Sequence, residues 1–416
     1  MVGTGVFVSL HFQVLSFQSA PPIFALWIAG GLAALCGALS YAALAKALPR
    51  SGGEYHFLGQ LYHPSLGFMA GLLSALIGFA APTAIVALAL GAYAQSCFPD
   101  INPKIVAAVV ILLGAISHAM SARTSGRVQL VSTVLKMLFI VAFLVAAVIL
   151  PGHGDIRWTP QSSDWSAMMS PAFGISLMFV FYAYSGWNAA VYGLEEWKQP
   201  ESTVKRALVG GTIVVMILYV ALNAAFLHAA PLAALQDKMQ VADAAAQSLF
   251  GAPAARWTSG LLAVGLFSSV SALLWAGPRV LGTMGRNMPA LGWFAPTDGV
   301  PRNALVFQTV LALAFVMWSS LGTLIDYTQA GLILCSALAV MGIFVLRRRG
   351  LAKELNPVIP LVFIAMSVFV IGQSLYKEIT ASDKTLHGLA AFPTVCGLLT
   401  ALVCALLWFP FNRKSR

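Results

Sequence analysis

Two apolar stretches of this sequence are interrupted by small residues in the same way. The first reads Met1-Val2-Gly3-Thr4-Gly5-Val6-Phe7, and the second reads Tyr182-Ala183-Tyr184-Ser185-Gly186-Trp187-Asn188. A glycine interruption in a membrane helix frees backbone N–H and C=O groups, so it persists only where protein or a wet cavity surrounds it. Paired interruptions in matching positions of two halves of a chain indicate a transporter's binding site. Tight packing of helices through small residues is the alternative explanation for either motif alone.

The composition is that of a membrane protein. Of the 416 residues, 59% are hydrophobic and 9% are charged, whereas soluble domains carry about 25% charged residues. The net charge is +10, but the basic residues lie in short clusters between apolar stretches, which argues against a nucleic-acid partner. The five cysteines show no CxxC spacing and the seven histidines no HExxH motif. The sequence therefore predicts no metal site and no cofactor.

About twelve apolar segments approach the roughly 20 residues that a helix needs to cross a bilayer. They are 1–18, 22–48, 66–97, 104–121, 128–150, 171–196, 206–230, 257–284, 303–320, 324–346, 357–375 and 388–410. Of the lysines and arginines, 17 lie in the even-numbered loops and the C-terminal tail, and 6 lie in the odd-numbered loops. By the positive-inside rule, we expect a multi-pass protein of the cell (cytoplasmic) membrane with its C-terminus in the cytoplasm.

The interrupted segments are the first and the sixth, and they are five spans apart. Because five is odd, a repeat of five spans must insert upside down relative to the first five. The sequence therefore predicts an all-α membrane fold with a 5+5 inverted repeat. Residues 1–150 would form the first repeat, with helix 1 incomplete, and 171–346 the second. Residues 357–410 would form two extra helices, and 411–416 a cytoplasmic tail.

Four motifs resemble those of amino acid permeases of the amino acid–polyamine–organocation (APC) superfamily, and most closely the L-type amino acid transporters. They are Gly3–Phe7; Ala38–Tyr41 with Leu48–Tyr55; Tyr184–Asn188 with Glu195–Pro200; and Trp275–Arg279 with Gly285–Asn287. The resemblance implies a leucine-transporter-like fold with broken helices 1 and 6. Members of this family carry a longer segment before the first motif. We therefore expect that the true start lies upstream and that this chain is truncated at its N-terminus.

The two breaks supply complementary backbone groups for a zwitterion. The helix that starts after the first break presents free N–H groups and a positive dipole end, which suit a carboxylate. The half-helix that ends at the second break presents free carbonyl oxygens, which suit an ammonium group. The predicted substrate-binding residues are Gly3, Thr4, Gly5, Tyr182, Ala183, Ser185 and Gly186.

Lys136 lies inside the fifth span, and a charged side chain at that depth is a functional hypothesis. The resemblance implies that it occupies the place of a sodium ion and bonds the broken first helix, so transport would not need sodium. Snorkelling of the lysine toward the membrane surface is the alternative.

Gates are predicted at both ends of the site. The resemblance implies that Tyr182 covers the substrate as an outer gate, although an aromatic in an apolar span also suits the core. Arg50, Glu195 and Glu196 are predicted to form an inner-gate ion pair, with a solvated helix end as the alternative.

No Asp or Glu lies mid-span near the breaks, and Asp326, the nearest candidate, is expected at the outer surface. We therefore expect an amino acid symporter or antiporter for neutral substrates, working independently of sodium by proton symport or exchange. The alternative is a polyamine or cationic amino acid permease. A transporter-like sensor and a membrane-embedded enzyme are further alternatives, for which the sequence offers neither a soluble domain nor a catalytic cluster. The expected partners are a small amino acid and the lipid bilayer, and the sequence does not predict an oligomeric state.

Overall fold

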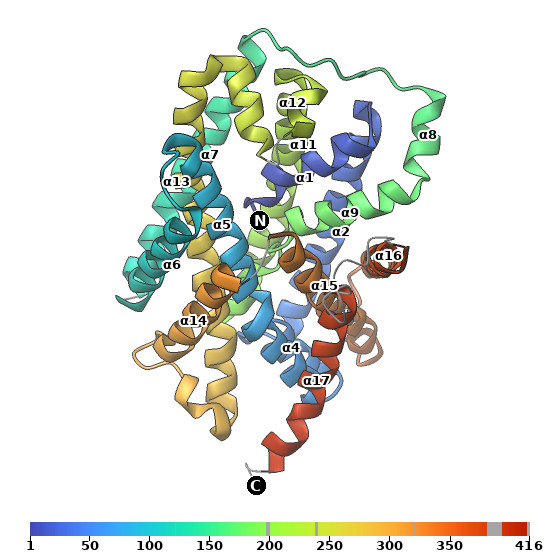
Figure 1. Cartoon of the computed structure of the whole chain (residues 1–416). Coiled ribbons are helices and arrows are strands. Elements are labelled where there is room, and N and C mark those ends of the chain that lie inside the picture. The colour runs from blue at the N-terminus through green and yellow to red at the C-terminus, as the bar shows by residue number, and fades with distance from the viewer. Residues whose placement is uncertain (121, 197–199, 238–239, 319–320, 381–392, 414–416) are drawn as a thin grey trace.

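The computed structural model describes the backbone of residues 1–120, 122–196, 200–237, 240–318, 321–380 and 393–413. Within these ranges, it describes all side chains except those of residues 122, 123, 125, 196, 200–202, 318, 321–327 and 410–413. The described part is a bundle of helices without a β-strand. The N-terminus lies in the middle of the bundle, and the C-terminus lies at the lower end in Figure 1.

The helices follow one another in two runs. Up to the second break they are α1 (Gly5–Ser16), α2 (Ala20–Ala47), α3 (Glu54–Leu61), α4 (Pro64–Leu73), η1 (Ser74–Gly78), α5 (Ala80–Cys97), α6 (Pro103–Met120), α7 (Ala122–Ile149), α8 (Ser162–Met168) and α9 (Pro171–Tyr184). After it they are η2 (Ala189–Glu196), α10 (Pro200–Lys205), η3 (Arg206–Gly210), α11 (Gly211–Ala229), α12 (Leu232–Asp237), α13 (Val241–Asn287), η4 (Pro289–Phe294), α14 (Arg302–Trp318), α15 (Leu321–Arg348), α16 (Val358–Thr380) and α17 (Pro393–Arg413).

Eight helices in the described part of the chain are long and apolar enough to cross a membrane. The bent pair Ser162–Met168 and Pro171–Glu195, whose axes differ by 67°, makes a ninth if the two helices are counted as one span. Three shorter apolar helices, Gly5–Ser16, Arg302–Met317 and Pro393–Phe409, fall at the remaining predicted positions. The expectation of an all-α membrane fold is confirmed, and the assignment of 1–150 and 171–346 to inverted repeats stays a prediction.

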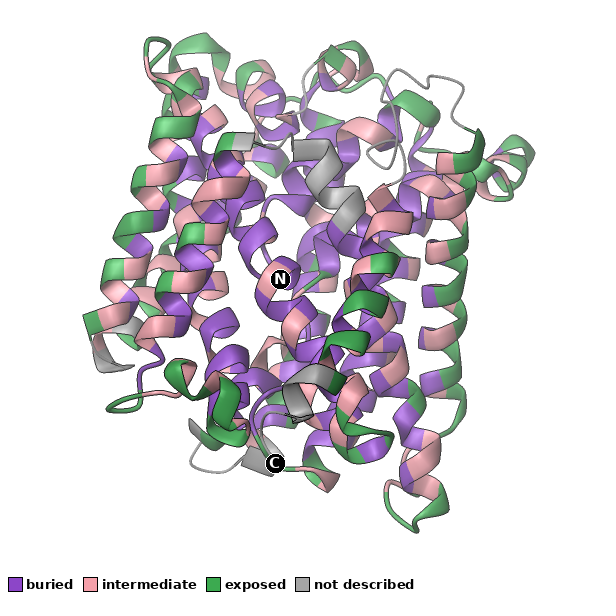
Figure 2. Cartoon of the chain, turned by 60° about the horizontal axis from the view of Figure 1, so that its bottom comes forward, coloured by how far each residue is buried: buried purple, intermediate pink, exposed green. Residues whose placement is uncertain are grey.

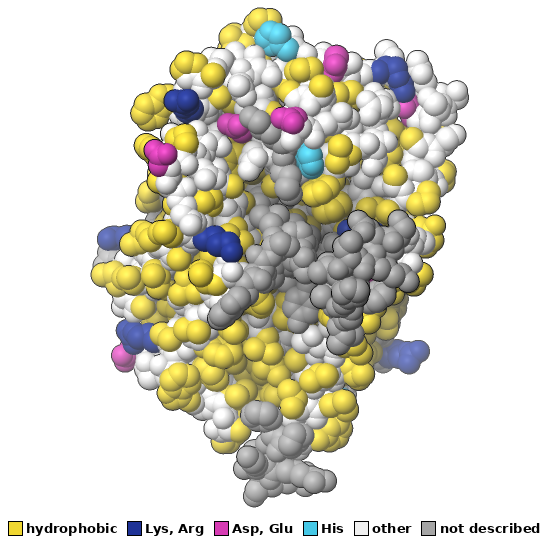
Figure 3. Space-filling model, viewed as in Figure 1, with side chains coloured by type: hydrophobic (Ala, Val, Ile, Leu, Met, Phe, Trp, Pro, Cys, Tyr) yellow, Lys and Arg dark blue, Asp and Glu magenta, His cyan; other side chains and the backbone are white. Residues whose placement is uncertain are grey.

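The outer surface of the bundle is suited to lipid. Figure 2 shows the buried residues gathered in the interior, with exposed residues on the outer helix faces. On α6 and α7, large apolar side chains such as Ile105, Ile116 and Leu138 are more than half exposed. Figure 3 shows hydrophobic side chains gathered over the middle and lower parts of the described surface in this view, with scattered charged side chains. Apolar surface on this scale would be costly in water and is favourable against hydrocarbon.

The third and the seventh predicted spans each contain a π-helical turn, the seventh at Arg206–Gly210, and α13 begins before the predicted span 257–284. The turn in the third span, Ser74–Gly78, lies between α4 and α5. The long helix α13 bends at Gly251, where φ is +77°, two residues before Pro253. Such turns depend on local backbone geometry that hydropathy does not report, although π-turns inside α-helices often lie at functional sites.

An ion pair fixes α8 at the upper end of the bundle in Figure 1. The Arg157 guanidinium lies 2.6 Å from Asp164 Oδ1, and the Ser19 hydroxyl donates to the same oxygen at 2.7 Å. These donors, with the Gln161 backbone N–H, lower the pKa of Asp164 from 3.8 to about 2. The cluster therefore joins α8 and the segment before it to the start of α2.

Candidate substrate-binding site

The first interruption is present at the start of the chain. Residues 1–4 are not helical, and α1 begins at Gly5. A Cβ atom placed on Gly5 would overlap the backbone of Ala183, whereas one on Gly3 would meet only ordinary contacts at 3.7 Å. Close packing therefore explains the glycine at position 5, and it does not explain Gly3.

The second interruption ends α9 at Tyr184. Ser185 is extended, with ψ 148°, and Gly186 has φ +88°, a conformation that side-chain-bearing residues rarely adopt. The chain resumes as the short 3₁₀ segment η2, and Gly193 within it departs from helical geometry. The predicted break at this glycine is therefore confirmed.

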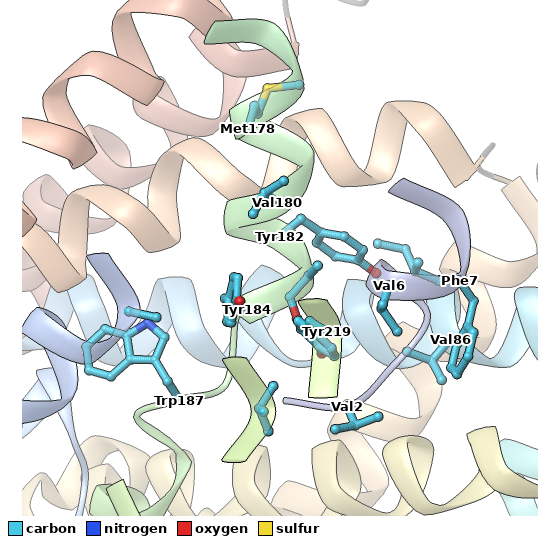
Figure 4. Close-up of a cluster of buried hydrophobic side chains, with 14 of the residues drawn as sticks. Val2, Val6, Phe7, Val86, Met178, Val180, Tyr182, Tyr184, Trp187 and Tyr219 are labelled. Atoms are coloured by element: carbon cyan, nitrogen blue, oxygen red, sulfur yellow. The ribbon is translucent and has the colours of Figure 1, made fainter. Parts of the chain in front are cut away.

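The two interruptions lie against each other. Thr4 Oγ1 is 3.1 Å from the hydroxyl oxygen of Tyr182. Figure 4 shows the Tyr182 ring pointing from α9 toward the start of α1. The Tyr219 hydroxyl lies within donating distance of two carbonyl oxygens, that of Ala183 at 2.9 Å and that of Met1 at 2.8 Å. Backbone that the breaks release is thus partly satisfied by side chains from other helices, as burial in a membrane requires.

A cavity of about 570 Å³ lies at this junction, a volume typical of small-molecule sites. Every predicted substrate-binding residue lines it, and so does Lys136: the set is Gly3, Thr4, Gly5, Lys136, Tyr182, Ala183, Ser185 and Gly186. Residues that are distant in sequence therefore share one internal space.

The polar backbone around the cavity is arranged by helix direction. The first turn of α1 presents N–H groups that have no carbonyl partner within the helix, and the Thr4 side chain does not cap it. At the end of α9, the Tyr182 carbonyl accepts from Ser185 N–H at 3.0 Å. A carbonyl oxygen has two lone pairs, so this one can accept a second donor.

Lys136 is buried, with 8% of its surface exposed. Its ammonium group donates to the Val2 carbonyl oxygen and, at 3.1 Å, to the Ser269 hydroxyl. The Ser269 hydroxyl also donates to the Val2 carbonyl at 2.8 Å. The lysine therefore bonds the non-helical segment before α1 and is buried rather than directed to the surface. Its role in place of a sodium ion, which the resemblance implies, stays a prediction.

Of the predicted inner-gate residues, Arg50 and Glu195 are not among the described residues that line the cavity. The Glu195 carboxylate is 3.3 Å from Arg286, and both side chains are about half exposed. The Glu195 backbone N–H donates to the Ser51 hydroxyl at 3.0 Å, one residue beyond Arg50. The side chains of Glu196 and Asp326 lie outside the described residues, so the ion-pair gate stays a prediction.

Sequence reasoning missed two parts of the cavity wall. Glu54 lines the cavity, although it lies in the turn after the second span and not in the middle of a span. The π-turn contributes Ser74 and Gly78 to the wall. The signal for Glu54 was the Gly52–Gly53 pair before it, whose positive φ angles let the chain fold back on itself. Nothing in the sequence near Ser74 indicates a π-turn.

Known proteins match this chain over nearly its whole length. A family model described as amino acid permease matches residues 1–407. The serine/threonine exchanger SteT of Bacillus subtilis is 27% identical, over 96% of this chain and 93% of its own length. The b(0,+)-type amino acid transporter 1 of Mus musculus is 24% identical, over 91% and 80%. The large neutral amino acids transporter small subunit 2 of Oryctolagus cuniculus is 26% identical, over 97% and 76%. With its helical membrane bundle and paired breaks, the chain belongs to the amino acid permease family and is a multi-pass membrane protein that transports amino acids.

Proposed function

We propose that the chain is a secondary active transporter that moves neutral amino acids across the cell membrane by alternating access, without sodium, by proton symport or exchange. One observation carries this proposal: two interrupted helices meet at a single cavity lined by their freed backbone. The start of α1 would hold the carboxylate, the carbonyls at the end of α9 would hold the ammonium group, and Tyr182 would cover the substrate. The inverted repeat, the cytoplasmic C-terminus and a non-enzymatic role belong to the same proposal.

Sodium independence follows from the position of Lys136. Its Nζ donates to the Val2 carbonyl, at the place where a bound cation would otherwise support the interrupted helix. Uptake into proteoliposomes should therefore be unchanged when choline replaces sodium. Uptake that disappears in choline would contradict this part of the proposal.

A cationic amino acid or a polyamine is the second candidate substrate, because Glu54 places a carboxylate in the cavity wall. Thermal unfolding of the purified protein with each common amino acid and polyamine distinguishes neutral from cationic substrates. A ligand at about 100 times its Kd stabilises the folded state by about 2.7 kcal/mol and so raises the melting temperature. We expect neutral amino acids to raise the melting temperature. A rise with cationic amino acids or polyamines alone would favour the second candidate.

A further inference from the structure

Glu54 is a buried acid in the cavity wall. The helix that it begins, α3, leads into α4, which lies between the N-terminus and the C-terminus in Figure 1. Glu54 lies directly after the Gly52–Gly53 turn, and only 3% of its surface is exposed. Among the described residues, no lysine or arginine forms an ion pair with it within 4 Å. A buried carboxylate is costly unless it is hydrogen-bonded, so its contacts indicate what holds it there.

One oxygen of Glu54 connects three segments of the chain. Its Oε1 accepts a hydrogen bond from the Tyr41 hydroxyl of α2 at 2.6 Å and another from Asn188 Nδ2 at 2.7 Å. Asn188 lies between the second break and η2, and its Nδ2 also donates to the Tyr192 hydroxyl at 3.0 Å. The carboxylate therefore ties the chain after the second break to α2 and to the start of α3.

The turn before Glu54 closes on the same segment. A Cβ atom on Gly53 would overlap the Tyr192 ring, so only glycine allows this approach. At the far end of the segment, Glu195 N–H donates to Ser51. The segment after the break is thus held at Asn188, Tyr192 and Glu195 by Glu54, Gly53 and Ser51, respectively.

We propose that Glu54 is a positioning residue of the transport cycle, which latches the segment after the second break against α2 and so closes the end of the cavity nearer the C-terminus. This inference rests on the proposed transport function. Charge-assisted hydrogen bonds to Oε1 favour the closed state. Oε2 is buried and accepts no hydrogen bond from the described residues. When the segment moves away from α2, water can reach Oε2, and this hydration offsets the loss of the hydrogen bonds to Oε1. The closed and open states are therefore close in free energy.

The test uses Cys335, which lines the cavity and is 3% exposed. In a variant whose other four cysteines are serine, the rate of alkylation by a membrane-impermeant maleimide is measured in right-side-out and inside-out vesicles. We expect Glu54→Gln to speed alkylation about tenfold from the face that carries the C-terminus and to leave the rate from the opposite face unchanged. Glu354→Gln, on a carboxylate that is 88% exposed, is the matched control and should change neither rate.

Equal acceleration from both faces would indicate general loosening and would overturn the proposal, as would an unchanged rate. Tyr41→Phe keeps the charge and removes one donor, so it should give a smaller change on the same face. It also serves as the test if Glu54→Gln does not fold. Labelling requires no substrate, so its outcome is separate from the outcome of the ligand screen, which tests the transport function itself.

Discussion

Gly5 allows the two broken helices to touch, because its missing side chain leaves room for the backbone of Ala183. We expect Gly5→Ala to lower the free energy of unfolding by about 1–3 kcal/mol, the usual cost of overpacking, and to impair transport. Gly3→Ala is the matched control, since a Cβ atom there meets only ordinary contacts. Thermal unfolding of both variants measures the difference, and equal melting temperatures would show that the contact is not tight.

Lys136 supports the segment before α1 by donating to the Val2 carbonyl. Lys136→Met keeps the length of the side chain and removes the charged donor, which is worth about 1.5–3 kcal/mol. We expect transport to fall at least about tenfold while the protein still folds. Lys46→Met, on a lysine side chain that is 60% exposed, should transport normally. Normal transport by both variants would show that transport does not require Lys136.

Asp164 gives the stability of the protein a pH dependence. Its pKa is about 2 in the folded protein against 3.8 ordinarily, because Arg157 and Ser19 donate to the ionised form. A lowered folded pKa contributes stability that is fully present above about pH 4 and is lost as the pH falls toward 2. The melting temperature of the wild type should therefore fall more steeply between pH 4 and 2 than that of Asp164→Asn. Parallel curves would contradict the assignment.

The second break depends on a backbone conformation that only glycine adopts readily. Gly186 has φ +88°, so Gly186→Ala should cost about 1–2 kcal/mol of stability and reduce substrate binding. Gly372 is the matched control: it lies in α16, where an added Cβ atom meets nothing within 4 Å. Gly372→Ala should stabilise the protein by about 0.5–1 kcal/mol. Denaturant unfolding of both variants tests the opposite signs.

The elements differ in how well the sequence predicts them. Lipid requires long apolar helices with satisfied backbones, so hydropathy locates the spans, and glycine motifs locate both breaks. The π-turn Ser74–Gly78 and the bend at Gly251 were not predicted. A short shift in hydrogen-bond register leaves the apolar character of a span unchanged, and the packing that selects such a shift is not local in sequence.

The candidate site was predictable in its backbone parts and not in its side-chain network. The glycines of the two motifs, Gly3, Gly5 and Gly186, mark the breaks in the sequence itself. The Gly52–Gly53 pair marks a turn before Glu54, but the sequence does not show that this turn folds back against Tyr192 and brings Glu54 to the cavity. The contacts of Tyr219 with both breaks also required the packed structure, since a tyrosine in an apolar span has many ordinary roles.

At the scale of the whole molecule, a cavity of about 570 Å³ lies where two broken spans meet. The cavity wall combines the freed ends of helices with the buried side chains of Lys136 and Glu54. Such a site can replace the hydration of both charged groups of an amino acid, and a transporter must then expose it to each side in turn. The cavity and the latch at Glu54 are therefore parts of one proposed cycle.

Counterflow tests the central claim most directly. Proteoliposomes containing the protein are loaded with an excess of an unlabelled neutral amino acid and placed in a trace of the same labelled compound. A carrier predicts transient accumulation of label inside, above its outside concentration, and a strong reduction of that accumulation in the Gly186→Ala variant. Entry of label no faster than into protein-free liposomes, across the neutral amino acids, would contradict the account.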